Sequence, residues 1–384
     1  MDRYYKELIL ILRKALINDD SKINPETLSE IENLAINQMV LPIAGDGVTK
    51  MGLQLPEKWK LFMITVAMRN CKNLDTQQKI LNILKENNIQ CVILKGISVS
   101  MYYHEPLHRP LGDIDILVDE ENYDKAINIL TGSTERVSDY SKHKFHYHFT
   151  YDGLTVEVHK FMTEYSDDKY GEFLKEHLKN ALNNIEIKQY KCYNFPVLSC
   201  EFQIISLLLH TQRHFFEHKT NLRMICDYAM YIQTLTTEDW NMIYPTLEKL
   251  NLNTFADALI LLCSNFLGIQ VNWEVKSNVS HNTIENLMEE FLRDGFSPKF
   301  IGNSNKVSIW EMVKSIFVAI HSVAKNEFDI LEKAPILYPW FWIFVPLRTL
   351  LRKIKGNKKT IQIADYSIAV ERRKKLCKKL NLND

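Results

Sequence analysis

The chain has 384 residues, and its 47 Lys plus Arg balance its 47 Asp plus Glu, so the formal net charge at pH 7 is zero. That balance disfavours an RNA acceptor, although local basic patches that could hold nucleic acid are not excluded. Seven Cys without a Cys-x-x-Cys pair indicate reduced, buried thiols in a cytoplasmic protein. The N-terminal residues lead into an amphipathic pattern rather than a signal peptide, and the length predicts two or three domains.

Residues 1–88 are predicted to form a helical N-terminal region, because their apolar residues recur at spacings of three and four. Examples are Leu8, Ile11, Leu12 and Leu16, then Leu61, Ile64, Met68, Ile80, Leu81 and Leu84. Between these helices, the Gly and Pro content of residues 40–47 predicts a connecting loop.

Residues 89–198 are predicted to form an α/β core, which begins with a buried strand at Cys91 to Leu94. The strand ends at Lys95-Gly96, and helical spacing follows from Ile97 to Tyr103. Gly96 lets a phosphate approach the backbone, and the next helix N-terminus offers N–H groups to an anion. Lys95 and Ser98 could add a charge and a hydroxyl.

An Asp-x-Asp pair, Asp113 and Asp115, enters the apolar strand that ends at Val118. Side chains alternate along a strand, so both carboxylates lie on one face, about 6–7 Å apart. Two like charges at that spacing are costly unless a cation neutralises them. The pair therefore predicts a divalent-metal site, for Mg²⁺ or Mn²⁺, since all-oxygen ligands favour hard cations.

A third carboxylate follows on a strand after the Asp152-Gly153 turn signal. The period of two places Thr155, Glu157 and His159 on one face, with Val156 and Val158 on the other. Glu157 could therefore join the Asp pair. His159 could bind phosphate or the acceptor, or it could simply hydrogen-bond to the acids.

Later elements are also predicted from spacing. An amphipathic helix is expected over residues 119–130, and a strand pair or an edge strand over 185–198. Two helices are expected over 201–216 and 222–235, the first capped by Ser199. Residues 199–384 are thus predicted to be a helical C-terminal region with a basic tail. The apolar segment 334–347 is too short and too rich in proline to span a bilayer. With the basic run after it, segment 334–359 could contact a membrane surface or pack on the helices. The tail over 369–380 is predicted to be a solvated helix or a disordered arm.

Two groups of histidines suggest zinc, but neither is favoured. His210, His214 and His218 recur every four residues, and His146 and His148 share a strand face. Neither group has an evident local carboxylate or Cys partner, and the metalloprotease Glu is missing.

The order of glycine bend, helix, Asp-x-Asp strand and carboxylate strand resembles the polymerase β-like nucleotidyltransferase superfamily. More narrowly, the chain resembles a bacterial uncharacterised nucleotidyltransferase family, whose members carry Leu-Lys-Gly and an Arg before Asp-Ile-Asp. Here these are Leu94 to Gly96, Arg109 and Asp113 to Asp115. Many superfamily members have Gly-Ser or Gly-Gly in the loop, whereas this chain has Lys-Gly. The implied fold is α+β, a small mixed sheet flanked by helical regions.

The resemblance also implies roles for residues. Asp113, Asp115 and Glu157 would be catalytic and bind two Mg²⁺ or Mn²⁺ ions, while Lys95, Gly96, Ser98 and Arg109 would contact phosphates or brace the loop. His210, His214, Arg223 and Asp227 would line the pocket for nucleotide or acceptor. The alternatives are a buried network around the helix pair, an Arg223–Asp227 salt bridge and an ion pair of Arg109 with Asp113 or Asp115.

The implied reaction is transfer of a nucleoside monophosphate from an NTP, such as ATP, to the hydroxyl of an unidentified acceptor, with release of pyrophosphate. Two other functions remain open on the same fold. One is a non-catalytic nucleotide-binding sensor, and the other is a toxin-like nucleotidyltransferase that modifies tRNA or protein.

Overall fold

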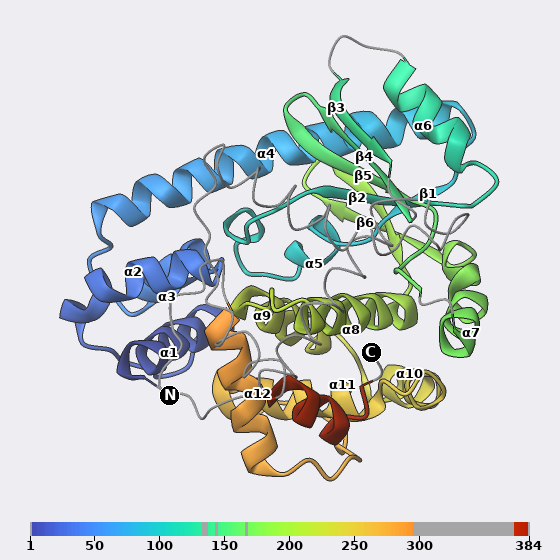
Figure 1. The fold of residues 1–384 in the computed structure, drawn as a ribbon. Helices are drawn as coiled ribbons and strands as arrows, with labels where there is room; N and C mark the ends of the chain where they lie inside the picture. The colour runs from blue at the N-terminus through green and yellow to red at the C-terminus, as the bar shows by residue number, and fades with distance from the viewer. Residues whose placement is uncertain (1, 133–136, 143–144, 166–167, 295–371, 383–384) are drawn as a thin grey trace, which may run out of the picture. The chain divides into compact units, whose positions relative to one another are not determined.

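The computed structural model describes residues 2–132, 137–142, 145–165, 168–294 and 372–382 (Figure 1). The chain divides into two compact units, Met1–Ser297 with Lys378–Asp384, and Pro298–Cys377. The first unit contains the predicted core. The predicted apolar and basic segment 334–359 lies outside the described residues. Among the helices that are described, none is long and apolar enough to cross a membrane.

Four helices form the N-terminal region, as predicted: α1 (Arg3–Ile17), α2 (Leu28–Asn37), α3 (Leu41–Lys50) and α4 (Glu57–Glu86). Asp2 caps α1, since its side chain accepts a hydrogen bond from the Tyr4 N–H. Of the apolar residues whose spacing predicted these helices, Leu8, Ile11 and Leu12 of α1 and Ile80, Leu81 and Leu84 of α4 are buried. Leu61, Ile64 and Met68 in the first half of α4 are exposed instead.

The loop predicted over residues 40–47 is wrong, because helix α3 occupies it. Pro42 lies in the first turn, where a missing N–H costs nothing. The two glycines permit close packing. A Cβ on Gly45 would lie 2.3 Å from Met63 Sδ, and one on Gly47 would lie 2.1 Å from the Ile11 carbonyl oxygen. These glycines therefore serve helix contacts rather than a turn.

A seven-stranded mixed sheet follows, in the order β3-β4-β5-β2-β1-β7-β6. Its strands are β1 (Cys91–Ile93), β2 (Ile114–Val118), β3 (Val137–Lys142), β4 (His146–Tyr151), β5 (Leu154–His159), β6 (Ile185–Tyr190) and β7 (Tyr193–Leu198). The pairs β2–β5 and β1–β7 are parallel, and the other neighbours are antiparallel. The α+β prediction is confirmed.

One face of this sheet is the core. Ile114 and Ile116 of β2 and Val156 and Val158 of β5 are buried there, together with side chains of α4 and α6 (Figure 1). Because strand side chains alternate, the residues between them point to the opposite face. The side chains of Asp115, Glu157 and His159 therefore lie on the face of the sheet opposite the core.

The remaining helices and short turns complete the described chain. They are α5 (Ile97–Ser100), α6 (Tyr123–Gly132), α7 (Lys169–Leu178), α8 (Cys200–Phe216), α9 (Leu222–Ile232), α10 (Thr237–Lys249), α11 (Asn253–Leu262), α12 (His281–Asp294), with short turns at Pro25–Thr27, Pro106–His108, Lys179–Leu182 and Cys263–Leu267. Helix α6 begins later than predicted, because the Asp119 side chain accepts the Asn122 N–H at 2.7 Å and forms a turn there.

Residues 372–379 of the basic tail are helical, which confirms the helix of the two predicted alternatives, although Arg373, Leu376 and Cys377 are buried rather than solvated. Asn251 Nδ2 donates to the Asn381 carbonyl at 2.7 Å just after this helix. The cysteines are free, as predicted, but Cys71 and Cys192 are exposed rather than buried.

Candidate active site

Three acidic residues converge on the face of the sheet opposite the core. The parallel register of β2 and β5 pairs Asp115 directly with Glu157, which confirms the predicted common face for these two acids. Asp113 lies two residues earlier, just before the first residue of β2. Desolvation, followed by the charges of Asp115 and Glu157, raises the pKa of Asp113.

Asp115 is buried between two cationic groups. Lys95 Nζ lies 3.1 Å from its Oδ1, and His159 Nε2 lies 2.9 Å from the same atom. Burial alone would raise the pKa of Asp115, but Lys95 and His159 outweigh it and hold that pKa well below the usual range. Lys95 thus contacts the acid that the sequence analysis assigned to a metal.

Glu157 is flanked by two histidines. Its Oε2 is 3.3 Å from His159 Nε2, and its Oε1 is 3.8 Å from His146 Nε2. Burial opposes ionisation of Glu157, yet the hydrogen bond from His159 lowers its pKa. The antiparallel pairing of β4 with β5 sets His146 opposite His159, so a carboxylate partner for His146 comes from the neighbouring strand. The sequence showed no such partner.

The bend before α5 requires glycine. Gly96 has φ 67°, in the left-handed region where a side chain would be strained. The helix expected as far as Tyr103 ends at Ser100 instead. The N–H groups of Val99 and Ser100 donate to the Gly96 carbonyl at 3.3 and 3.0 Å, so the helix is a single turn. The buried Ser98 Oγ has no hydrogen-bond partner among the described residues.

Arg109 braces the chain rather than facing the acids. Its Nε and Nη2 donate to Asp227 Oδ1 and Oδ2 at 3.0 and 2.5 Å, and Tyr103 OH donates to Oδ1 at 2.7 Å. Both carboxylate oxygens of Asp227 are therefore engaged by Arg109. The expected pairs of Arg109 with Asp113 or Asp115, and of Arg223 with Asp227, are replaced by this longer-range pair.

The backbone just before β2 is also held by α4. We call residues 107–112 the pre-strand segment. Asn70 Nδ2 donates to the carbonyls of Leu107 and Arg109 at 2.7 and 2.9 Å, and its Oδ1 accepts the Leu111 N–H at 3.0 Å. Asn73 Nδ2 donates to the Gly112 carbonyl at 3.2 Å. These two asparagines were not predicted as functional residues. The sequence feature that could have revealed them is an amide side chain on the face of α4 that is otherwise buried.

Helices α8 and α9 lie toward the acidic face of the sheet (Figure 1). Burial, with Lys95 and His214 nearby, keeps the pKa of His210 well below its usual value. Burial also lowers the pKa of His214 to about 4. The two rings meet edge to face with centroids 4.4 Å apart. The lowered pKa values of both residues favour the neutral imidazoles. His218 does not continue their face, because α8 ends at Phe216.

Among the described residues, Arg223 of α9 forms no ion pair comparable to that of Arg109 with Asp227. Its Nη1 donates to the Pro110 carbonyl at 3.2 Å, and its buried Nε has no partner in the described part of the chain. Burial, followed by repulsion from Arg109, lowers the pKa of Arg223 to about 10. His214 Nδ1 is likewise buried without a partner among the described residues. We call His210, His214 and Arg223 the helical side of the site.

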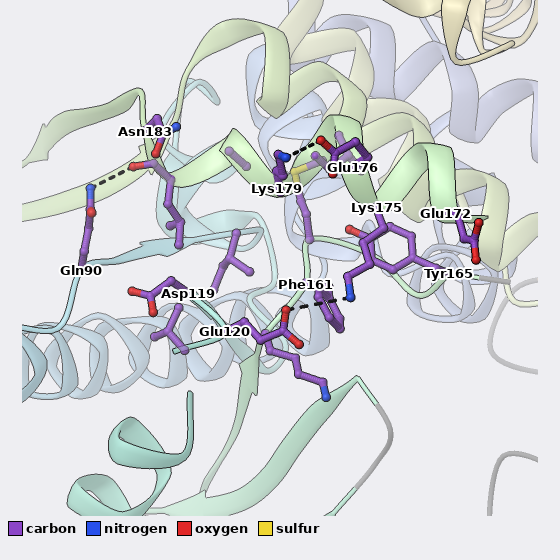
Figure 2. A pocket seen from close by; sticks show the side chains of 17 residues that line it. Gln90, Asp119, Glu120, Phe161, Tyr165, Glu172, Lys175, Glu176, Lys179 and Asn183 are labelled. Atoms are coloured by element: carbon purple, nitrogen blue, oxygen red, sulfur yellow. Dashed lines mark hydrogen bonds and ion pairs between the residues drawn. The ribbon is translucent and has the colours of Figure 1, made fainter. Parts of the chain in front are cut away.

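A separate cavity of about 480 Å³ lies at the other end of β2 and β5 (Figure 2). Its lining includes Asp119, Lys160, Phe161, Tyr165 and Lys175. Asp119 lies six residues beyond Asp113, which corresponds to about 20 Å along an extended strand. None of the predicted site residues lines this cavity, so it is distinct from the acidic site.

A mixed sheet with carboxylates on neighbouring strands beside a glycine bend is the arrangement that the nucleotidyltransferase resemblance predicted. The model of the uncharacterised nucleotidyltransferase family matches residues 24–268, and the chain belongs to that family. It is therefore a member of a transferase family. No curated protein matches the chain.

Proposed function

We propose that this protein transfers a nucleoside monophosphate from an NTP to an acceptor hydroxyl, with pyrophosphate as the leaving group. Asp113, Asp115 and Glu157 would hold the divalent ions. The observation that carries the proposal is the β2–β5 register, which brings the buried Asp115 and the half-buried Glu157 together on the face opposite the core, near Asp113. Three carboxylates are the donor set that Mg²⁺ and Mn²⁺ prefer, so the residues fit the ions.

The bound ions would polarise the α-phosphate and stabilise the charge that develops on the attacking and leaving oxygens. The chain itself supplies positioning. Ser98 Oγ and Arg223 Nε are buried polar atoms without partners in the described chain, and both are suited to donate to phosphate oxygens. The neutral His210 and His214 can donate hydrogen bonds without adding charge.

Glu157 would accept the proton of the attacking hydroxyl, since it is ionised at neutral pH and its side chain is more accessible than that of Asp115. Lys95 is tied to Asp115 and therefore orients that carboxylate. Arg109 and Asp227 act as positioning residues, since they form an ion pair with each other and thereby fix the segment that leads into Asp113.

The test is label transfer from each of the four α-labelled NTPs with Mg²⁺ or Mn²⁺, against pooled small-molecule, RNA and protein acceptors. We expect transfer by the native protein and a loss of about a thousandfold or more in Asp113→Asn and Asp115→Asn, the scale of removing one electrostatic stabiliser of a transition state. Asp119→Asn is the matched control at the far end of the same strand and should retain activity. Equal transfer by Asp115→Asn and the native protein would refute the proposal.

A nucleotide sensor is the second candidate, and one observation favours it. Lys95 Nζ and His159 Nε2 lie 3.1 and 2.9 Å from Asp115 Oδ1, so groups of the protein itself contact the carboxylate that the transferase reaction would assign to a metal ion. A sensor would bind NTP and gain thermal stability from it, with no label transfer to any acceptor.

A further inference from the structure

We propose that His146, Glu157 and His159 form a site for one divalent transition-metal ion of the Zn²⁺ or Co²⁺ type. The site shares Glu157 with the proposed nucleotidyl transfer but does not depend on that reaction. It differs from the three-carboxylate site in chemistry, because two of its three donors are imidazole nitrogens.

The donor atoms are spaced for a small ion. One ligand atom from each residue lies within 4.8 Å of the other two. Glu157 lies 3.3 Å from His159 Nε2 and 3.8 Å from His146 Nε2. A tetrahedral ion with bonds near 2.0–2.1 Å separates its donors by about 3.4 Å. The separation of Glu157 Oε2 from His159 Nε2 therefore matches this spacing. His146 Nε2, which lies 3.8 Å from the other oxygen of Glu157, must move closer for the three donors to share one ion.

The strands hold these donors in place. Glu157 and His159 are two residues apart on β5, and the antiparallel register sets His146 of β4 directly opposite His159. The two imidazole centroids are 5.1 Å apart. The hairpin is closed by Asp152 and Gly153, both with positive φ, as in the tight turns that fix register. A site on two paired strands is preorganised, which lowers the cost of binding.

The donor set selects the class of metal. Imidazole suits Zn²⁺, Co²⁺ and similar ions, whereas Mg²⁺ requires oxygen donors and retains water. Two histidines with one carboxylate leave a fourth position open, as in catalytic rather than structural zinc sites. Asp115 Oδ1, 2.9 Å from His159 Nε2, is the nearest additional donor. The ion would therefore lie beside the three-carboxylate site.

The experiment uses the full-length protein after chelator treatment and dialysis, with Co²⁺ as a spectroscopic probe. We expect one Co²⁺ per chain and visible absorption bands of tetrahedral, nitrogen-containing coordination. Zn²⁺ should displace Co²⁺, and Mg²⁺ in large excess should not. His146→Gln should weaken Co²⁺ binding by at least about tenfold and abolish the bands, since loss of a ligand costs at least as much as loss of its supporting shell.

Two further variants, compared with His146→Gln, separate the two sites. Asp113→Asn removes a carboxylate that is not in the histidine set, so the Co²⁺ bands should persist while Mg²⁺-dependent NTP binding falls. His146→Gln should do the reverse. His281→Gln removes an exposed imidazole at the start of α12 and controls for adventitious binding.

The proposal is overturned if His146→Gln, shown to be folded by thermal unfolding, binds Co²⁺ with the native affinity and spectrum. It is also overturned if His281→Gln weakens binding as much as His146→Gln does. Failure of the native protein and of every variant to bind NTP would count against the nucleotidyl-transfer proposal. The Co²⁺ site would still be tested separately, by the comparison of His146→Gln with His281→Gln.

Discussion

The pre-strand segment and the helical side of the site both lie near the start of β2, yet they differ in whether their buried polar groups have hydrogen-bond partners. In the pre-strand segment, Asn70 bonds three backbone groups, and Arg109 is matched to both oxygens of Asp227. On the helical side, the buried Nε of Arg223 and Nδ1 of His214 have no partners among the described residues.

Leaving a buried donor unpaired costs free energy, roughly 1–3 kcal/mol for a neutral group and more for a charged one. A folded protein therefore usually supplies a hydrogen-bond partner for each buried donor, unless a bound ligand supplies it. The comparison indicates that the pre-strand segment is built for rigidity and that the helical side is built to bind. The two arginines, Arg109 and Arg223, are the sharpest test of this difference.

The largest effect should come from Arg109→Met. It leaves the buried Asp227 charge without its partner, and we expect the free energy of unfolding to fall by about 3–5 kcal/mol, measured by urea denaturation. The double variant Arg109→Met with Asp227→Leu should recover most of that loss, because no charge is left buried. A loss below about 1 kcal/mol in the single variant would contradict a bracing role.

Asn70→Ala should be next. It removes the amide that holds Leu107, Arg109 and Leu111, and we expect the unfolding free energy to fall by about 1–3 kcal/mol because buried backbone groups lose their partners. Arg69→Ala, at the neighbouring exposed position of α4, should change stability by no more than about 0.5 kcal/mol. Similar values for the two variants would show that α4 does not hold the segment.

Arg223→Gln should affect ligand binding rather than folding. Removal of a charged donor to phosphate should weaken NTP binding by about tenfold or more, measured by titration calorimetry with Mg²⁺. The unfolding free energy should change far less than in Arg109→Met. Arg213→Gln is the control, since Arg213 pairs with Glu164 at 3.0 Å and with Glu217 at 3.1 Å. Equal loss of NTP affinity in Arg223→Gln and Arg213→Gln would contradict a specific role of Arg223 in phosphate binding.

The smallest effect is a pH dependence at His108. Its hydrogen bond with Asp46, 2.7 Å between Nδ1 and Oδ1, raises the pKa of His108 in the folded state. Since the folded pKa exceeds the unfolded value of about 6.5, the stabilisation is complete below pH 6.5 and is lost as the pH rises through the folded pKa.

His108→Gln should therefore lower stability by about 1 kcal/mol or less in mildly acidic buffer and by almost nothing in mildly alkaline buffer. Thermal unfolding at the two pH values measures the difference. Asp46→Asn should show the same pattern, and a His108→Gln effect that is equal at both pH values would exclude this contact as its source.

Much of the sheet could be predicted from sequence, because strand parity is a local property. The alternation of Val156, Glu157 and Val158 indicated the face of Glu157, and the structure agrees. The pairing of Arg109 with Asp227 could not be predicted in this way, since 118 residues separate them and no local pattern connects them. The roles proposed for these residues remain predictions.

The remaining differences arise from contacts between elements. The glycines of α3 indicated a loop because their value in close helix packing depends on Met63 and Ile11, which belong to other helices. The grouping of His146 with Glu157 and His159 depends on the β4–β5 register, which strand composition alone does not specify.

The parallel alignment of β2 with β5 makes the acidic trio sensitive to insertions in a position-dependent way. One residue added inside β5 ahead of Glu157 would move each later side chain of the strand to the other face of the sheet. The Glu157 carboxylate would then face the core, and a valine would face Asp115. The same addition at the Asp152 hairpin tip could be absorbed by a longer turn. Foreign peptides could therefore be grafted at that tip, whereas the five residues from Thr155 to His159 tolerate no change in length.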